Sequence, residues 1–264
     1  MAISGIRIKD FFVFKGEFTA RFCSGVNIFT GGNGTGKTTL LRAIAIEHKN
    51  KHVFIPAGDM LEHTELYPMD RQYRLTYNDS EIEIIGSATL PVTNEITPNA
   101  AKTLDRIKSV IGGEAVYENG AFLIVKSDGA KIPFVLEAKG FRKFGLLWKL
   151  LRNGLLESES VLFWDEPENS LNPELIPVLV DILLELSRNG VQIFIATHSE
   201  IFASYFSVNQ QKCDSVMFYS LYKDERGEIK ADANERFDLL EQNKLMEVPV
   251  KLYEKQIEKG FGNG

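Results

Sequence analysis

The stretch GGNGTGKTT, residues 31–39, combines glycines, one lysine and adjacent threonines in a pattern suited to holding phosphate. Gly31 to Thr38 satisfies the P-loop pattern G-x-x-x-x-G-K-[ST]. Glycines let backbone N–H groups turn toward an anion, because no Cβ stands in the way. Lys37 would place a cation against the β- and γ-phosphates of a nucleotide, and Thr38 would offer its hydroxyl to Mg²⁺. The predicted nucleotide-binding residues are Gly32, Asn33, Gly34, Thr35, Gly36, Lys37, Thr38 and Thr39.

A second group of chemically competent residues lies in VLFWDEPENSLNPE. Asp165 ends an apolar run and is predicted to hold Mg²⁺, directly or through a water. Glu166 follows at once, where a carboxylate can orient and deprotonate an attacking water. An isolated Asp-Glu pair is usually a solvated strand end. The four apolar residues before this pair, and the P-loop upstream, favour catalysis instead.

The third candidate is His198 in VQIFIATHSE. It follows another apolar run, so we expect it at the same edge of a sheet as Asp165. A histidine at a strand end is often structural, but beside the other two motifs a sensor of the γ-phosphate is the better interpretation. Lys37, Glu166 and His198 are therefore the predicted catalytic residues.

These residues need a sheet edge to bring them together. VNIFT leads into the glycine loop, and a helix is expected near Thr38–His48. SVLFW and VQIFIAT are continuous apolar runs, as expected for strands buried on both faces. Between them, Asn172 is the predicted cap of a helix that has Pro173 at its first position and Gly190 after its last turn. The pattern predicts an α/β fold of P-loop NTPase type: a mostly parallel sheet flanked by helices, with an antiparallel N-terminal β subdomain.

We expect a single domain made of two lobes. Residues 1–58 and 155–264 would form the nucleotide-binding core, and residues 59–154 an inserted lobe. Residues 59–136 read as polar and irregular, with breaks at Pro91 and Pro98. Hairpin turns are predicted at Asp128-Gly129 and Arg226-Gly227. A helix over KFGLLWKLLRNG closes the inserted lobe, and helices are expected from Asn234 to Lys259.

Composition narrows the class of protein. The chain has 264 residues, 44% hydrophobic and 25% charged, which is typical of soluble globular proteins. Thirty Lys and Arg against 36 Asp and Glu give a net charge of −6, so no global basic field indicates nucleic acid. Two cysteines, Cys23 and Cys213, make a disulfide framework improbable. No signal-peptide pattern and no apolar run of about 18 residues is present, so a cytoplasmic protein without a membrane span is expected.

Together, GGNGTGKTT, VLFWDEPENSLNP and ATHS resemble Walker A, Walker B with its catalytic Glu and D-loop, and the switch histidine of ABC-superfamily ATPases. The chain is most similar to small bacterial and phage ATPases of the AAA-named group, which are related to OLD and SMC heads. The resemblance implies ATP and Mg²⁺ as cofactors. It also implies a homodimer in which the P-loop of one subunit meets the signature loop of the other across ATP.

The signature segment departs from that pattern. The usual sequence is close to LSGGQ, whereas this chain has EAKGFRKFG over residues 137–145. Gly140 is retained and is expected to face the partner's nucleotide, but Ala138 stands where a serine is usual. A γ-phosphate oxygen would lose that donor, at a cost of about 1–3 kcal/mol. The charges of Arg142 or Lys143 are the expected compensation.

Three further expectations concern a loop residue near the nucleotide, a group of phenylalanines and the two tryptophans. The glutamine that relatives carry after the strand beyond the P-loop is not evident, and Asp59 and Glu62 are its candidates, with solvated loop carboxylates the more probable interpretation. Phe11, Phe12 and Phe14 are expected to pack in the core, although one could stack on adenine as in the superfamily. Trp148 and Trp164 are expected in the core.

Two functions stay open. The first is a hydrolysing ATPase whose dimer regulates a separate partner, such as an effector in a phage-defence or toxin–antitoxin module. Intact Asp165, Glu166 and His198 favour it. The alternative is an ATP-gated binding or scaffold protein with little turnover, which the degenerate signature favours. DNA contact is suggested only by relatives and is unsupported by net charge. With 66 residues after His198, we expect no further catalytic domain.

Overall fold

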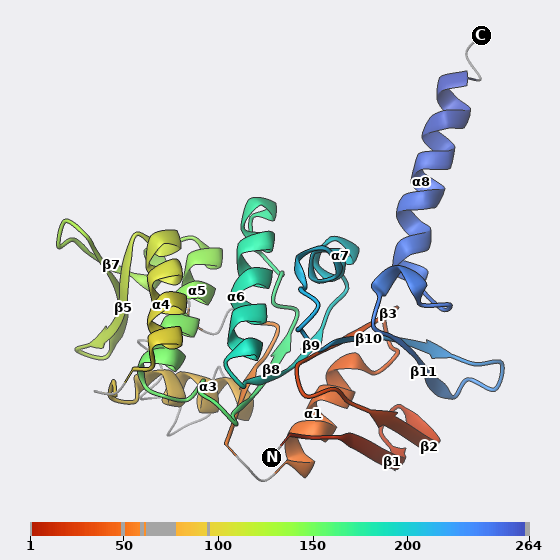
Figure 1. Ribbon diagram of the computed structural model, residues 1–264, viewed down its shortest axis with the longest axis horizontal. Coiled ribbons are helices and arrows are strands. Elements are labelled where there is room, and N and C mark those ends of the chain that lie inside the picture. Colours follow the sequence, from red (N-terminus) through yellow and green to blue (C-terminus); the bar gives the residue numbers. More distant parts are fainter. Residues whose placement is uncertain (1, 49–50, 59–60, 62–77, 94–95, 262–264) are drawn as a thin grey trace.

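The central element of the computed structural model is a six-stranded sheet (Figure 1). The structure describes residues 2–48, 51–58, 61, 78–93 and 96–261. Neighbouring strands in this sheet are parallel except for β10 (Val216–Lys223) and β11 (Ile229–Asn234), which are antiparallel. The strand order is β11 (Ile229–Asn234), β10 (Val216–Lys223), β3 (Val26–Gly31), β9 (Gln192–Ala196), β8 (Val161–Asp165) and β4 (His52–Ile55). The predicted mostly parallel α/β fold is confirmed.

Both faces of the sheet are buried because alternate side chains of each central strand enter different cores. Ile193 and Ile195 of β9 face one core, and Phe194 faces the other. The first core is covered by α5 (Lys139–Arg152), α6 (Ile176–Arg188) and α7 (Glu200–Asn209). The second is covered by α1 (Lys37–Glu47) and by the N-terminal hairpin, on the opposite side of the sheet in Figure 1.

The predicted antiparallel N-terminal β subdomain is confirmed as a two-stranded hairpin, but its turn was not predicted. IRIKDFFVF reads as one strand with phenylalanines in the core, but β1 (Gly5–Phe11) ends and β2 (Phe14–Arg21) begins within it. Phe12 lies in the turn with a φ of 51° and is 84% exposed, whereas Phe14 is 1% exposed. The core assignment of Phe12 is therefore wrong. DFFVF contains no Gly, Pro or Asn, and its one turn-forming residue is Asp10, which has a φ of 48° and accepts from the Gly16 N–H at 2.9 Å.

The polar segment before β5 is more regular than predicted. It contains α3 (Asp79–Thr89) and α4 (Pro98–Ile111). Asn78 and Glu81 form a capping box at the start of α3, and Thr97 caps α4 with Pro98 at its first position. Pro98 therefore begins a helix where we expected a break.

A small antiparallel sheet completes this lobe. Its strands are β5 (Gly113–Glu118), β6 (Ala121–Lys126) and β7 (Lys131–Pro133), followed by the 3₁₀ turn η2 (Phe134–Leu136). The predicted turn at Asp128-Gly129 joins β6 to β7, and Gly129 has a φ of 86°. The lobe's apolar residues belong to the same buried cluster as α6 and the sheet, so the inserted elements and the core pack as one body.

Helix ends follow the predicted signals. Asn172 caps the 3₁₀ turn η3 (Pro173–Leu175) that leads into α6, and Gly190 follows with a φ of 91°. The predicted turn at Gly227 joins β10 to β11. The chain then forms η4 (Phe237–Leu239) and α8 (Lys244–Phe261), which projects away from the sheet in Figure 1. In the described part of the chain, no helix has the length and apolar content that a membrane span needs.

Candidate active site

The glycine loop joins β3 to α1 at the carboxyl edge of the sheet and is shaped by close backbone contacts. Gly31 has a φ of 138°, and a Cβ there would lie 2.3 Å from the carbonyl oxygen of Leu221. Gly36 caps α1 in a left-handed conformation, with a φ of 87°. A Cβ on Gly36 would lie 2.8 Å from Val13 Cγ2, in the turn of the N-terminal hairpin. Glycine at these two positions lets the backbone N–H groups and the start of α1 form an anion cradle.

Lys37 is held inside this loop and is only 5% exposed. Its ammonium donates to the carbonyl oxygens of Gly31, at 2.8 Å, and Gly32, at 3.1 Å. Burial lowers the pKa of Lys37 to about 8, although the carboxylates of Asp165 and Glu166 oppose the shift. A cation that is costly to bury gains strongly from an anionic ligand, and phosphate supplies that anion.

Thr38 and Asp165, both predicted to hold Mg²⁺, lie in contact. The Thr38 hydroxyl donates to Asp165 Oδ2 at 2.8 Å. Burial raises the pKa of Asp165, while the hydrogen bond from Thr38 acts in the opposite direction. A hydroxyl and one carboxylate suit Mg²⁺, which takes few protein oxygens and completes its shell with water and phosphate. Among the described residues, no group of three His, Cys, Asp or Glu would hold a metal alone.

Glu166 and His198 meet across the neighbouring strands β8 and β9. Asp165 is paired with Ala196, so the residues that follow these strand ends lie at one edge. His198 Nε2 lies 3.5 Å from Glu166 Oε1. Burial lowers the pKa of His198 and the charge of Lys37 lowers it further, against the opposing effects of Glu166 and Asp165, which favours the neutral imidazole. A neutral imidazole can donate one hydrogen bond without adding a charge.

The backbone at Glu166 is strained. Its φ is 49°, a region that non-glycine residues seldom adopt and that costs about 1–3 kcal/mol. The Glu166 N–H donates to the carbonyl oxygen of Ala196 at 2.8 Å, which fixes the turn against β9. Strain of this kind persists only where the surroundings hold it, and it directs the Glu166 carboxylate toward His198.

Glu168 is a site residue that the sequence analysis missed. Its Oε1 accepts hydrogen bonds from Thr197 Oγ1 at 2.5 Å and from the His198 N–H at 3.3 Å. Its Oε2 is buried without a hydrogen-bond partner among the described residues. Burial raises the pKa of Glu168. The carboxylate thus ties the turn after β8 to the segment that carries His198. The only available signal was its position two residues after Glu166.

Replacing Glu168 tests this tie through stability. Because the folded pKa of Glu168 is raised, ionising it in the folded protein costs stability as the pH rises above the unfolded value of about 4.5. Gln keeps an acceptor and removes the charge, so Glu168→Gln is expected to match or exceed wild-type stability at pH 7.5, with its advantage growing from pH 4.5 upward. Glu168→Ala loses the acceptor and should be less stable by about 1–3 kcal/mol. Denaturant unfolding from pH 4 to 8 measures both; equal stability of the Gln and Ala variants would contradict the tie.

The signature-like segment begins α5. Ala138 is the N-cap and makes no side-chain capping bond. Gly140 is buried under the chain's own Leu171, where a Cβ would lie 2.9 Å from Leu171 Cδ1. Arg142 and Lys143 are the two residues expected to compensate with their charge. Arg142 is 4% exposed, and Lys143 donates to backbone carbonyls of its own chain. A role for Arg142 or Lys143 at a partner's phosphate stays a prediction.

The remaining predicted residues are placed as follows. Thr39 lies half-buried in the first turn of α1, and Asn33 and Gly34 are exposed on the loop. Trp148 and Trp164 are 6% and 1% exposed, which confirms them as core residues. Asp59 and Glu62 lie outside the described residues.

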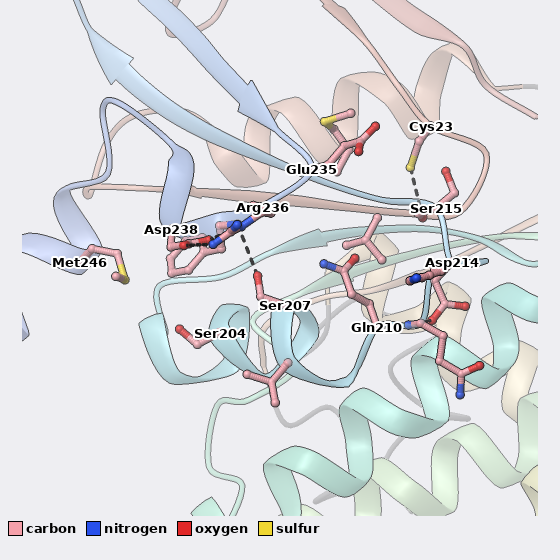
Figure 2. A pocket seen from close by; sticks show the side chains of 16 residues that line it. Cys23, Ser204, Ser207, Gln210, Asp214, Ser215, Glu235, Arg236, Asp238 and Met246 are labelled. Atoms are coloured by element: carbon pink, nitrogen blue, oxygen red, sulfur yellow. Dashed lines mark hydrogen bonds and ion pairs between the residues drawn. The ribbon is translucent and has the colours of Figure 1, made fainter.

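A cavity of about 870 Å³ lies at the other edge of the sheet and contains none of these residues (Figure 2). It is bounded by the end of α7, the start of β10 and residues 235–238. Val216 begins β10 beside Val26, whereas the P-loop follows the far end of β3. The charged Arg236 and Asp238 in the cavity pair with each other at 2.5 Å. The chemistry predicted from the sequence is thus not at this cavity.

The fold and the glycine loop together define a P-loop ATPase domain. A profile of the family described as "AAA domain, putative AbiEii toxin, Type IV TA system" matches residues 55–204, and a second AAA domain profile matches residues 5–46. The chain belongs to the first of these families. A search of curated proteins found no match.

Solved structures share the fold at low identity. An SMC head bound to the C-winged helix domain of ScpA is 10% identical, covers 89% of this chain and 98% of its own, and has a TM-score of 0.58. The SMC head from Thermotoga maritima is 15% identical, with coverages of 88% and 98% and a TM-score of 0.52. An ATP-binding cassette of an ABC transporter in its ADP conformation is 17% identical, with coverages of 90% and 92% and a TM-score of 0.50. ATP binding is expected for a member of this group.

Proposed function

We propose that this protein binds ATP with Mg²⁺ and hydrolyses it to ADP and phosphate. The observation that carries the proposal is the convergence of three features at one sheet edge. These are the buried Lys37 ammonium, the Thr38–Asp165 pair and the Glu166–His198 pair. A glycine-rich turn that merely caps a helix would not need two acids, a histidine and a buried lysine around it.

Each residue has a role that follows from its position. The loop N–H groups and the start of α1 would bind the phosphates, and Lys37 would exchange its two carbonyl acceptors for phosphate oxygens. Thr38 and Asp165 would hold Mg²⁺, which neutralises charge on the phosphates when bound. Glu166 would accept the proton of the attacking water, and neutral His198 would donate a hydrogen bond to the γ-phosphate.

A second subunit would complete the site. The first turn of α5 has no side-chain cap, and Ala138 and Lys139 are exposed there. Helix N-termini bind anions through their N–H groups, so this turn suits the γ-phosphate of a facing subunit. Gly140 would contribute through its backbone, since its Cα packs under Leu171. We propose a head-to-tail homodimer with ATP between the subunits.

A separate protein partner is the proposed target of this dimer. The family description names a toxin of a type IV system, and the similar SMC heads have structures bound to ScpA domains. Both support a head that acts on another chain. Opening and closing of the dimer would then regulate that partner, with hydrolysis as the release step.

One observation favours the alternative of an ATP-gated binding protein with little turnover. Ala138 offers no hydroxyl at the N-cap of α5, so a partner-bound γ-phosphate would lack one donor. Steady-state phosphate release by the purified chain with saturating Mg-ATP separates the two functions. Release that disappears on removal of Mg²⁺ supports the hydrolase, whereas ATP binding without release supports the alternative.

The proposed dimer predicts a change in mass when ATP is added. In the Glu166→Gln variant, ATP should stay bound, so the protein is expected to double in mass when Mg-ATP is added. Light scattering after size-exclusion chromatography, at tens of micromolar protein, measures this. ADP serves as the control nucleotide, because it lacks the γ-phosphate that α5 of the partner would contact. A mass that is the same with and without ATP would rule out a nucleotide-sandwiched pair under these conditions.

A further inference from the structure

The turn that carries Glu166 is supported by a lysine from a different part of the chain. Residues 166–170 connect β8 to the segment before η3, and both Glu166 and Ser170 have positive φ values, 49° and 59°. Neither residue is a glycine, so the turn is strained at two points. Its own backbone hydrogen bonds are few: the Asn169 N–H donates to the carbonyl oxygen of Glu166 at 3.0 Å. Beside the contacts of Glu166 with Ala196 and of Glu168 with Thr197, a further contact from outside holds the turn.

Lys143 supplies that contact from α5. Its ammonium donates to three carbonyl oxygens of the turn: Glu166 at 3.3 Å, Pro167 at 2.9 Å and Asn169 at 2.5 Å. An ammonium has three N–H donors, and three carbonyl oxygens of the turn accept from this one. A surface lysine more often points to water or pairs with a carboxylate. Here the ammonium donates to the backbone of the turn that carries Glu166, the candidate general base, and its charge also acts on the carboxylate of Glu168.

The same helix begins at the signature-like segment. Gly140 and Lys143 are three residues apart and therefore lie on one face of α5. Gly140 packs under Leu171, which directly follows the turn, and Lys143 binds carbonyls along the turn from Glu166 to Asn169. The first turn of α5 and the turn after β8 are thus joined at both ends. A displacement of α5 on contact with a partner's nucleotide would reach Glu166 through this contact.

We propose that Lys143 is a positioning residue for hydrolysis: it holds the turn in the shape that directs Glu166 at the attacking water and couples that shape to the start of α5. The proposal rests on the proposed ATPase function. The Lys143 ammonium donates to the turn and makes no hydrogen bond to the described residues of the phosphate loop. Its loss should therefore change the chemical step and leave nucleotide binding intact.

The test compares Lys143→Met with Lys143→Arg and with a matched control, Lys102→Met, an exposed lysine on α4. Phosphate release is measured over a range of Mg-ATP concentrations, and the Kd for ATP is measured separately by titration calorimetry. We expect Lys143→Met to lower kcat about 10- to 100-fold with the Kd for ATP within about 3-fold of wild type, as for loss of a positioning contact. Arg can also donate to several carbonyls, so Lys143→Arg should recover at least a tenth of the wild-type kcat. Lys102→Met should match wild type.

The possible failures are distinguishable. If wild type hydrolyses ATP and Lys143→Met has the wild-type kcat, the role of Lys143 is wrong and the ATPase function stands. If wild type is no faster than Glu166→Gln, the ATPase function fails and this role fails with it. A loss of ATP affinity that parallels the loss of kcat would make Lys143 a binding residue and would overturn the proposal. Should Lys143→Met fail to fold, Lys143→Gln keeps a donor without the charge, and its kcat is expected between those of wild type and Glu166→Gln; a wild-type value would overturn the role.

Discussion

Phosphate release by Glu166→Gln is expected to fall by about 10²-fold or more, because general-base catalysis contributes about 10²–10⁴-fold. Gln has the shape of Glu but does not accept the proton of the attacking water. The substitution leaves the Thr38–Asp165 pair and the Lys37 cradle unchanged, so the Kd for Mg-ATP should stay within a few-fold of wild type. A coupled phosphate assay and titration calorimetry on the same preparations measure the two quantities.

The control for that loss is Glu225→Gln, which removes a charge at an exposed position in the β10–β11 turn. It should release phosphate at the wild-type rate. If Glu166→Gln also retained that rate, the general base would have to be another group, and Glu168, which accepts from the His198 N–H, would be the next candidate. A fall in kcat accompanied by an equal fall in ATP affinity would instead place Glu166 in nucleotide binding.

The parts of this site that could be predicted from sequence are those that follow a buried strand. VNIFT, SVLFW and VQIFIAT are predominantly apolar and short, a pattern typical of strands buried on both faces of a parallel sheet. The polar residue that ends each run must then lie at the carboxyl edge. That reasoning places Lys37, Asp165 and His198 near one another without any knowledge of distant contacts, and the structure brings them to one edge.

The parts that could not be predicted depend on contacts between distant segments. Lys143 reaches carbonyls 23–26 residues later in the chain, and Glu168 reaches residues about 30 positions away. Hydrogen bonds to backbone carbonyls do not depend on the residue types of the acceptors. No sequence motif therefore predicts the contact of Lys143 with the turn. Phe12 fails for a local reason: a turn built from apolar residues has the composition of a strand.

The strained backbone of Glu166 is consistent with the hydrogen bonds that Lys143 donates to the same turn. A residue with positive φ stays in that conformation only if its neighbours prevent relaxation, and the Glu166 backbone is held by Ala196 on one side and by Lys143 on the other. The side chain that would act on water is thereby fixed through its main chain. A fixed general base can act only on a phosphate that is itself held in place. Lys37 is the residue proposed to hold that phosphate.

Lys37→Met is expected to weaken Mg-ATP binding by about 10- to 100-fold, since hydrogen bonds to charged groups contribute about 1.5–3 kcal/mol. The stability of the nucleotide-free protein should move the other way. The pKa of Lys37 is lowered to about 8 from 10.5 by burial, so folding carries the full cost of the charged form below pH 8 and less of it as the pH rises to 10.5. Met removes that cost, and the unfolding temperature at pH 7.5 should equal or exceed that of wild type.

Opposite effects on binding and on stability distinguish a ligand-binding lysine from a structural one. Lys9→Met, at an exposed position on β1, is the matched control and should change neither quantity. Calorimetric titration with Mg-ATP and thermal unfolding from pH 7 to 10 provide the measurements. If Lys37→Met bound Mg-ATP with the wild-type Kd, the glycine loop would not be the nucleotide site. If it lost binding and stability together, the buried ammonium would be needed to shape the loop through Gly31 and Gly32 rather than to meet the phosphates.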